Sequence, residues 1–498
     1  MLKAEEIKKL IDDDITSRKK QYAKKGLAYY QGDHDILSYR LFYWNDDGEL
    51  VEDTTRSNFK IPHPFFAEIV DQTTQYILSG EDAFIKSDKP ELQTELDTYF
   101  DDEFIAELSE VLTGCQTKGF ENMFAYKNAE GRTRFQYADS MGIVEVRAKD
   151  TDGQTDHVIY WYVDRIDKGQ KVIKRIQVWD AKQVEYFVQV DNGAVEKDAA
   201  APINPKPHAL YTVEGDDKTY YEEYGFVPFF RMDNNKNQTS SLKPIKPLID
   251  DYDLMNSSLS NNLADFDTPI HVVKGFEGDD LSKLQQNLKT KKLIGMESTD
   301  AGAGVEVHTV NIPYQARQTK LELDEKNIYR FGMALNTAGL KDTNATTNVA
   351  IKAAYSLLDL KCSKLLIQLK KFLRKLIKVV LDEINEMNGT DYQMKDIYFD
   401  FNPEIMSNAQ ENAQIEFTEA QRRQTEITTL LNLAPQLDNE TLMQLICEQL
   451  DISYDDIKGK LPDPDEAQNA VTDAQGALNS VVVTDGQTTE GNPSITIE

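Results

Sequence analysis

The chain has 498 residues, with 55 basic and 85 acidic side chains and a formal net charge of −30. A single hydrophobic core stops growing at roughly 250–300 residues, so this length predicts about two to four domains. The acidity excludes ordinary tight DNA binding, which needs lysine and arginine to neutralise phosphates, so any nucleic acid is expected to be held loosely.

The N-terminal third combines helices with a short hairpin. Residues 3–30 place apolar side chains on one face of an amphipathic helix. An aromatic run at 39–44, followed by Asp47-Gly48, predicts a β-hairpin. We expect two further helices, at 65–79 and at 91–118.

The next segment changes to a period of two residues, which is typical of strands. Turn signals such as Asp152-Gly153 and Asn192-Gly193 separate its apolar runs, so we expect an antiparallel meander and an α+β domain. Residues 194–218 are rich in Ala, Pro, Asp and Lys, which predicts a loop. The expected strands are 132–137, 143–147, 157–163, 172–179 and 184–190.

Two helices then flank a small insertion. Helical patterns at 245–266 and 314–335 enclose residues 267–313. Within the insertion we expect strands at 270–273, 292–296 and 305–312 and a short helix at 279–288, which together predict a small α/β module.

A long helix follows a polar segment that runs from Asn336 to Asn348. Residues 349–387 contain neither Gly nor Pro, and their apolar positions alternate three and four apart. At a rise of ~1.5 Å per residue such a helix is roughly 60 Å long. A basic stripe on it is either a solvated face or a contact with acidic neighbours. The stripe consists of Lys361, Lys364, Lys371, Lys375 and Lys378.

The C-terminal part begins with an alternating run at 396–403, which predicts a strand that joins the N-terminal sheet. Helices are expected at 407–433, 439–450 and 453–459. No Lys or Arg occurs after Lys460, and residues 462–498 have the polar, acidic composition of a disordered tail.

No motif in the sequence supports catalysis or a cofactor. The phosphate-binding Gly-x-x-x-x-Gly-Lys-Ser/Thr is absent, as are His-Glu-x-x-His and Gly-x-Ser-x-Gly. The histidines are scattered, and acidic pairs such as Asp12-Asp13 are expected by chance in so acidic a chain. We therefore predict no catalytic, cofactor-binding or metal site. The competing class, a nuclease or packaging ATPase, would need a nucleotide-binding loop or convergent carboxylates.

The cysteines and the N-terminus bear on location. Cys115, Cys362 and Cys447 are far apart and odd in number, which predicts buried thiols in a reducing compartment. The first residues alternate charged and apolar side chains and lack an export signal, and lysines interrupt every long apolar window. We expect the protein to be made in the cytosol and to have no membrane partner.

Three short motifs resemble those of one known family. The most specific is Tyr29-Tyr-Gln-Gly-Asp-His-Asp-Ile-Leu37, and it is joined by Asp251-Tyr252 with Ser258-x-x-Asn261 and by the run that opens at Asn348. In this order the elements are similar to the portal proteins of tailed bacteriophages, in the SPP1-like family. The sequence departs from that pattern before the long helix, where relatives tend to carry Ser-Gly.

The resemblance implies a division of the chain into domains. It implies a wing, two stem helices that carry a clip, a tunnel loop, a wing-spanning long helix and a helical crown. The implied boundaries are 1–240 for the wing, 241–266 and 314–335 for the stem helices, 267–313 for the clip, 336–348 for the tunnel loop, 349–406 for the long helix and a wing strand, 407–461 for the crown and 462–498 for the tail.

The resemblance also implies function and partners. Family members form rings, usually of twelve subunits, at one capsid vertex, and double-stranded DNA passes through the ring. The implied partners are the terminase large subunit, the major capsid and scaffolding proteins, and a head-completion adaptor. A scaffold or adaptor that binds only protein stays as the alternative. The DNA-facing residues of the tunnel loop would be Lys341, Asp342, Thr343, Asn344, Thr346, Thr347 and Asn348.

Overall fold

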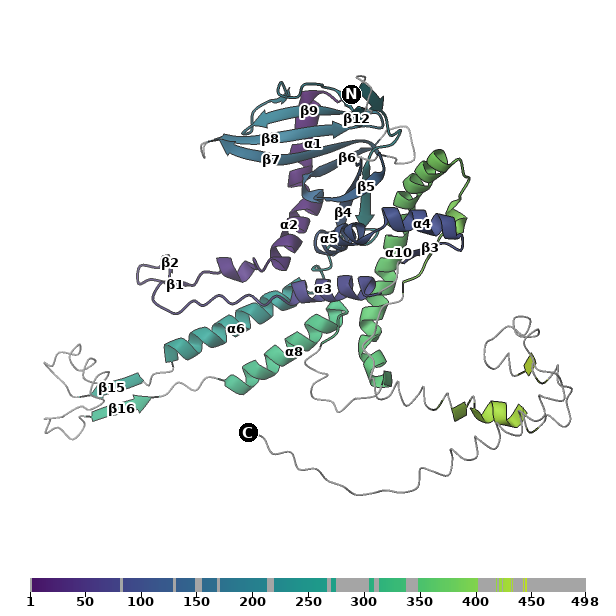
Figure 1. Cartoon of the computed structure of the whole chain (residues 1–498). Coiled ribbons are helices and arrows are strands. Elements are labelled where there is room, and N and C mark those ends of the chain that lie inside the picture. The colour runs from purple at the N-terminus through teal and green to yellow at the C-terminus, as the bar shows by residue number, and fades with distance from the viewer. Residues whose placement is uncertain are drawn as a thin grey trace, which may run out of the picture. The chain divides into compact units, whose positions relative to one another are not determined.

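The computed structural model shows a mixture of helices and sheets, so the α+β class is confirmed (Figure 1). Contacts divide the chain into two units, Met1–Ala345 with Val349–Ile405, and Thr346–Asn348 with Met406–Glu498. The residues that the structure describes are 2–80, 84–128, 131–147, 155–167, 171–212, 219–266, 270–274, 304–308, 313–336, 348–401 and scattered helical positions from 418 to 445.

The N-terminal segment forms two helices, α1 (Ala4–Thr16) and α2 (Arg18–Tyr30), so the single helix expected at 3–30 is wrong. Ser17 is extended, with φ −61° and ψ 142°, and its hydroxyl accepts a hydrogen bond from the Lys20 backbone N at 3.3 Å. A serine that caps the next helix interrupts the first one. Helix α1 lies against the larger sheet, where Ile7 and Ile11 are buried (Figure 1).

That larger sheet is the predicted meander, with the antiparallel order β10-β9-β8-β7-β6. The loop expected at 194–218 is wrong in part, because this range contains the strands β10, β11 and β12. Residues 213–218 of the range lie outside the described residues. Strand β11 (Lys206–Pro207) pairs with β9, and β12 (Ala209–Thr212) pairs with β13 (Thr219–Glu222). The meander strands are β6 (Ile143–Arg147), β7 (Thr155–Asp167), β8 (Lys171–Trp179), β9 (Gln183–Val190) and β10 (Val195–Lys197).

A second sheet has the order β14-β4-β5, built from β14 (Phe229–Asp233), β4 (Phe120–Lys127) and β5 (Thr133–Ala138). The strand expected at 132–137 is therefore β5 and does not belong to the meander. Two helices, α4 (Pro90–Tyr99) and α5 (Asp102–Lys118), replace the one expected at 91–118. The first helix ends with Phe100 as its C-cap, and Asp101 caps the second by accepting from the Phe104 backbone N at 3.1 Å.

The long helix is confirmed as α10 (Asn348–Asn388), and Gly389 follows it with φ +66°. Its apolar face forms the main core with α4, α5 and the second sheet, and Leu369, Leu373 and Leu376 are fully buried there. Burial of such side chains contributes about 1.5–3 kcal/mol each to folding.

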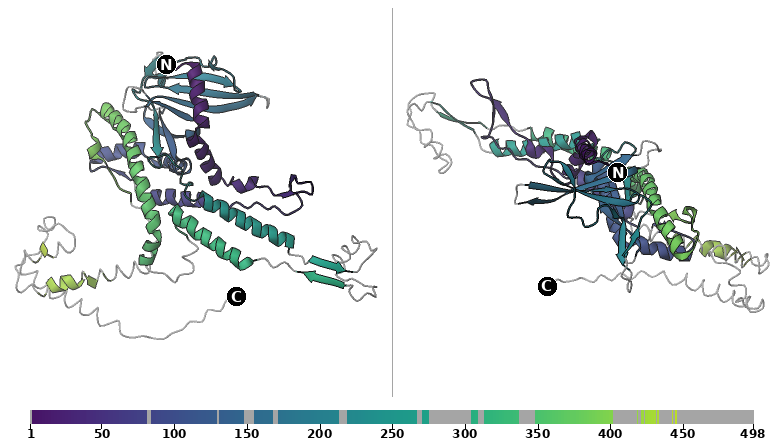
Figure 2. Two further views of the ribbon diagram at one scale, coloured as in Figure 1. Left: turned by 180° about the vertical axis from the view of Figure 1, so that it is seen from behind. Right: turned by 90° about the horizontal axis from the view of Figure 1, so that it is seen from above.

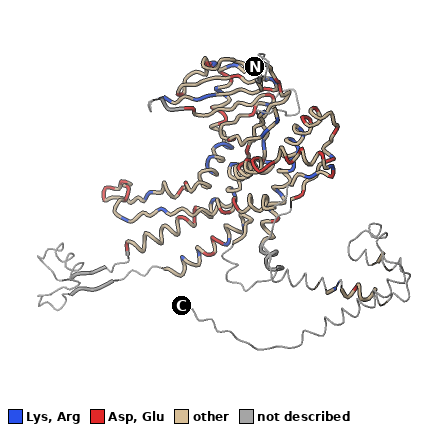
Figure 3. The backbone as a smooth tube through the Cα atoms, viewed as in Figure 1, with Lys and Arg blue, Asp and Glu red and all other residues tan. Residues whose placement is uncertain are grey.

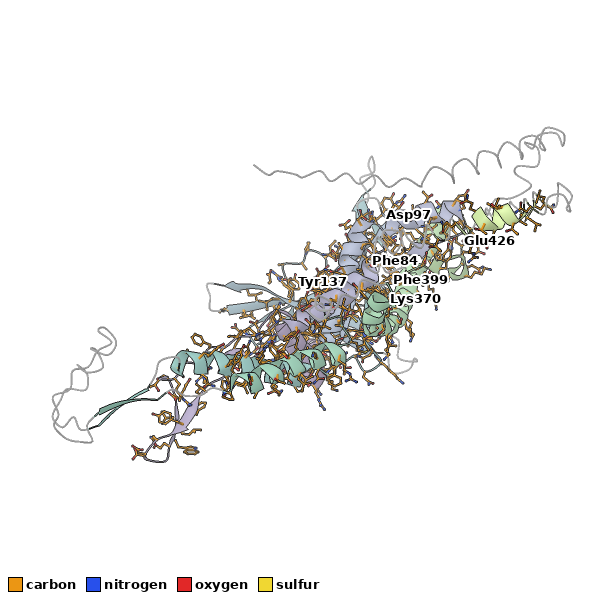
Figure 4. All side chains as sticks on the ribbon, turned by 90° about the horizontal axis from the view of Figure 1, so that it is seen from below. Phe84, Asp97, Tyr137, Lys370, Phe399 and Glu426 are labelled. Atoms are coloured by element: carbon orange, nitrogen blue, oxygen red, sulfur yellow. The ribbon has the colours of Figure 1, made fainter. Side chains whose placement is uncertain are left out.

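The strand expected to join the N-terminal sheet does not do so. It is β17 (Tyr398–Phe399), which in the described part of the chain forms a two-stranded sheet with β3 (Ile85–Lys86) beside α10. Figure 4 labels Phe84, Lys370 and Phe399 at this place. The Phe84 ring stacks on Phe401 at 4.8 Å, and the Lys370 amine lies 5.7 Å from the same ring. Aromatic contacts thus hold the returning chain against α10.

The helices expected at 245–266 and 314–335 are confirmed as α6 (Lys246–Phe266) and α8 (Tyr314–Gly332), which lie side by side (Figure 2). They meet α3 (Phe65–Leu78) in a second core. Between them, β15 (Ile270–Lys274) pairs antiparallel with β16 (Gly304–His308), and the expected helix at 279–288 and strand at 292–296 lie outside the described residues.

The hairpin predicted near the N-terminus is confirmed as β1 (Phe42–Trp44) and β2 (Leu50–Glu52). Short 3-10 turns occupy Asp35–Ser38, Ser140–Gly142 and Met394–Asp396.

Candidate functional site

The segment from Tyr29 to Leu37 packs against the start of helix α6, and we call this region the stem junction. Gly32 has φ +86°, so the chain turns sharply after α2 in a conformation that favours glycine. The turn folds His34 back onto Tyr29, whose ring stacks on the imidazole at 4.4 Å between centroids. Both side chains are buried. The turn therefore presents one imidazole edge to α6.

That imidazole is hydrogen-bonded to a buried carboxylate on α6. The Asp253 side chain is 1% exposed, and one of its oxygens lies 2.6 Å from His34 Nδ1. The other oxygen lies 2.8 Å from His63 Nδ1 and accepts from the His63 backbone N at 3.0 Å. Burial raises the pKa of Asp253, but hydrogen bonds from the two histidines outweigh burial and hold that pKa below its usual value. Asp253 thus joins α6 to segments on both sides of the hairpin.

A second charged group lies at the edge of the stem junction. The Lys246 amine contacts Asp35 at 2.8 Å and Asp250 at 2.6 Å, and it lies 4.9 Å from the Tyr29 ring centroid. The Tyr29 hydroxyl donates to Asp250. Burial raises the pKa of Asp35, whereas hydrogen bonds from Lys246 and Lys25 lower it, with a net value of about 2. The amine stays protonated because both carboxylates raise its pKa against the effect of burial.

Helix α3 contacts both sides of the expected tunnel loop. The Gln72 amide donates to the Leu335 carbonyl at 3.0 Å and accepts from the Leu335 backbone N at 3.1 Å, just after α8 ends. One turn later on α3, the Tyr76 hydroxyl donates to Asp359 of α10, and the Tyr76 ring stacks on Tyr355 at 5.9 Å. A single rigid helix therefore holds the segment before residue 336 and the helix that starts at 348.

The basic stripe is mostly exposed. Lys364, Lys371, Lys375 and Lys378 point into solvent, and none of them forms an ion pair within the described residues. Lys361 differs, because its amine is enclosed without a hydrogen-bond partner in the part of the chain that the structure describes. Burial lowers the pKa of Lys361 to about 8, with a small opposing effect from Cys362.

Comparison with known proteins identifies the family. The family described as "Phage portal protein, SPP1 Gp6-like" matches residues 8–453. The chain belongs to this family. It is 26% identical over 358 residues to the portal protein of Bacillus phage SPP1, covering 72% of this chain and 68% of the relative. It is 25% identical over 431 residues to the portal protein of Clostridium phage phiCD119, covering 83% of this chain and 89% of the relative.

The portal motifs predicted from sequence meet in the structure only in part. The motif at 29–37 contacts Lys246 and Asp253 of α6, on either side of the Asp251-Tyr252 segment, whereas Asp251 itself pairs with Lys320 of α8. Of the tunnel loop, only its two ends are described, Asn336, whose amide donates to Glu325 at 3.1 Å, and Asn348, the first residue of α10. Residues Lys341, Asp342, Thr343, Asn344, Thr346 and Thr347 lie outside the described residues, so their role stays a prediction, as does that of the stripe.

Sequence reasoning missed Asp253, His63, Gln72 and Tyr76, whose partners are about 190 to 283 residues away. The one available signal was the acidic run at 250–253, which includes the quoted Asp251-Tyr252.

Cys115 and Cys362 are free and buried as predicted, and Cys447 lies outside the described residues. No three potential metal ligands gather among the residues described, and none of the helices described there is long and apolar enough to cross a membrane.

Asp253→Ala is expected to destabilise the portal fold by about 3–5 kcal/mol, because it leaves the buried His34 imidazole and the partly buried His63 imidazole without their shared carboxylate. Asp251→Ala provides the matched control, since that exposed carboxylate pairs with Lys320 at 2.5 Å at the surface and is expected to contribute below about 1 kcal/mol. Thermal unfolding of both variants measures the difference. Equal shifts would show that the buried carboxylate does not hold α6 in place.

Lys361→Met is expected to raise the free energy of unfolding at pH 7 by about 1–3 kcal/mol, because an enclosed ammonium without a partner opposes folding. The folded-state pKa of about 8 lies below the ordinary 10.5. The unfolded chain therefore binds the proton more tightly, and the wild type gains stability as pH rises from 8 to 10.5.

The advantage of the methionine variant should accordingly be largest below pH 8 and shrink toward pH 10.5. Lys364→Met, one turn later and exposed, is the control and should change stability little at any pH. Denaturant unfolding at several pH values measures both. A pH-independent difference between Lys361→Met and wild type would contradict burial of the charge.

Proposed function

We propose that this chain assembles into a ring of twelve copies at one vertex of a phage capsid, and that double-stranded DNA passes through the ring during packaging, retention and ejection. The observation that carries the proposal is the family match, which spans residues 8–453 of the 498. The protein takes part as a structural component of the virion and performs no catalysis. Assembly takes place in the host cytoplasm.

The acidity of the chain supports a conduit. A net charge of −30 repels phosphate from all sides of a channel, so no position along the duplex is strongly favoured. DNA can then slide past weak polar contacts. Figure 3 shows acidic residues spread over the stem helices and the wing, with basic residues between them. The distribution favours a surface that guides DNA without holding it.

The division into wing, stem, clip and crown is part of the proposal. The clip at 267–313 would bind the terminase large subunit and later the head-completion adaptor. The antiparallel pair β15 and β16 supports this role, because a two-stranded sheet leaves strand edges that can pair with another chain. The wing at 1–240 would contact the major capsid and scaffolding proteins.

Negative-stain electron microscopy of the purified full-length protein tests the assembly. We expect rings with a central hole. The alternative function, a scaffold or adaptor that binds only protein, would be supported by compact monomers or closed particles without a hole. Addition of linear double-stranded DNA at low salt distinguishes the cases further, because a conduit should bind it weakly at most.

The tunnel loop at 336–348 would act as a valve that contacts DNA through many weak interactions. The contacts of α3 support this role, because Gln72 fixes Leu335 on one side and Tyr76 fixes Asp359 on the other. A loop with Gly339 and small polar residues between two anchored segments can change conformation while the helices beyond it do not unfold.

Ala354→Pro is expected to reduce the length of packaged DNA strongly, because proline in a helix interior costs about 3 kcal/mol and would disconnect the loop from α10. Ala350→Pro is the matched control, since it lies in the first turn of a helix that begins at Asn348, where proline is tolerated. Lys341→Ala should have a modest effect. Packaged length is measured after ring assembly is confirmed, and equal packaging by Ala354→Pro and wild type would overturn the valve.

A further inference from the structure

The hairpin formed by β1 and β2 exposes apolar side chains on both of its faces. Trp44 is 71% exposed and Leu50, its cross-strand partner, is 56% exposed. Phe42 and Tyr43, which point to opposite faces, are each about half exposed. A two-stranded hairpin without a covered face is marginally stable in water. Such a cluster of exposed aromatic residues is typical of a surface that another protein covers.

The same hairpin is acidic at its tip. Asp46, Asp47 and Glu49 lie in or beside the turn and form no ion pair within the described residues, whereas Glu52 and Asp53 pair with arginines of the hairpin itself. Figure 3 shows the tip in red. The hairpin therefore needs a partner that is both apolar and basic.

The exposed face of α10 has this character. Leu357, Leu360 and Ile367 lie on one face of the helix and are 39%, 50% and 57% exposed. Five cations lie on the same face, because each follows another residue of that face by four or seven residues, which is about one or two helical turns. They are Lys364, Lys371, Arg374, Lys375 and Lys378, and none of them forms an ion pair within the described residues.

These two surfaces cannot meet within one chain. The base of the hairpin is fixed to the far part of α6, where Ser57 Oγ contacts Asp265 at 2.6 Å and the Phe59 backbone N donates to Asn261 at 2.6 Å. Helix α10 packs instead on α4 and α5. In the views of Figures 1 and 2 the hairpin and α10 lie on opposite sides of this unit. A second copy can bring them together.

We propose that the β1–β2 hairpin of one copy docks on the exposed face of α10 of the next copy. Trp44 and Leu50 would cover Leu357, Leu360 and Ile367, and the acidic tip would contact the lysines. Because each copy uses two different surfaces, the contact is head-to-tail, which is the kind of contact that closes into a ring. This inference rests on the ring assembly proposed above and assigns the surfaces that make it.

Charge reversal tests the contact on the full-length protein. Lys371→Glu with Lys375→Glu should raise the concentration needed for half-assembly about a hundredfold, as should Asp46→Lys with Asp47→Lys, because each variant disrupts two interfacial charge pairs that contribute on the order of tenfold each. All four changes together should restore assembly to near the wild-type level. Lys171→Glu with Lys182→Glu, which makes the same charge change on exposed sites of β8 and the β8–β9 turn, should assemble normally. Mass photometry measures the assembled fraction.

Carbodiimide coupling identifies directly which segment lies on the exposed face of α10, because it forms an amide bond between a lysine and a carboxylate in contact with it. In rings of mixed ¹⁴N and ¹⁵N chains, we expect links from Lys371 or Lys375 to Asp46, Asp47 or Glu49 that carry one label on each side. Links to the acidic segment after residue 462 would overturn the inference, as would charge-reversed rings that assemble fully but fail to package DNA. Absence of rings in the wild type would instead refute the proposed function.

Discussion

The placement of α6 depends on one buried carboxylate. Asp253 lies on α6, and its two oxygens face imidazoles that come from the turn after α2 and from the segment before α3. Taking a carboxylate out of water is unfavourable unless its hydrogen bonds are replaced, and here each oxygen has a specific partner. Because burial of the carboxylate without these partners would be so costly, α6 must be placed where Asp253 meets both His34 and His63.

Around that charge the apolar contacts are less specific. Ile245, Ile249 and Ile328 pack with Phe66 and Ile69 in the junction core. Apolar contact stabilises many neighbouring arrangements of two helices, since it depends mainly on area removed from water. The hydrogen-bonded groups select one arrangement among them. Specific hydrogen bonds also fix helix α3 against the segments on either side of residues 337–347. The Gln72 amide pairs with both backbone groups of Leu335, and the Tyr76 hydroxyl pairs with Asp359 of α10.

Local signals in the sequence predicted the elements well, and long-range pairing accounts for most of the errors. The long helix was predictable because a Gly- and Pro-free amphipathic run continues to Gly389. Ser17 and Asp101 divided helices that periodicity alone had joined, since a cap can compete with helix continuation wherever the next turn offers free N–H groups. Strand β5 alternates like the meander strands, and only its pairing with β4 places it in another sheet.

The candidate site was predictable only where a motif was contiguous. Tyr29 and His34 belong to a motif that can be quoted from the chain, whereas Asp253 is one acid among 85 acidic residues and nothing local marks it as buried. Lys361 illustrates the same limit. Its spacing places it in a basic stripe, yet packing encloses its amine while Lys364 stays in water. Burial is a property of the whole fold, so spacing cannot supply it.

Asp253 and its two histidine partners are far apart in the sequence, and this distance sets the order in which they leave the ribosome. His34 and His63 precede their acceptor by 219 and 190 residues. At about 5–20 residues per second, the ribosome delivers the carboxylate on the order of 10–40 seconds after the histidines. The segment that bears the hairpin therefore leaves the ribosome well before α6 can anchor it. A nascent chain in this state therefore carries the aromatic hairpin without the contacts of Ser57 and Phe59 to α6 that hold its base in the folded protein.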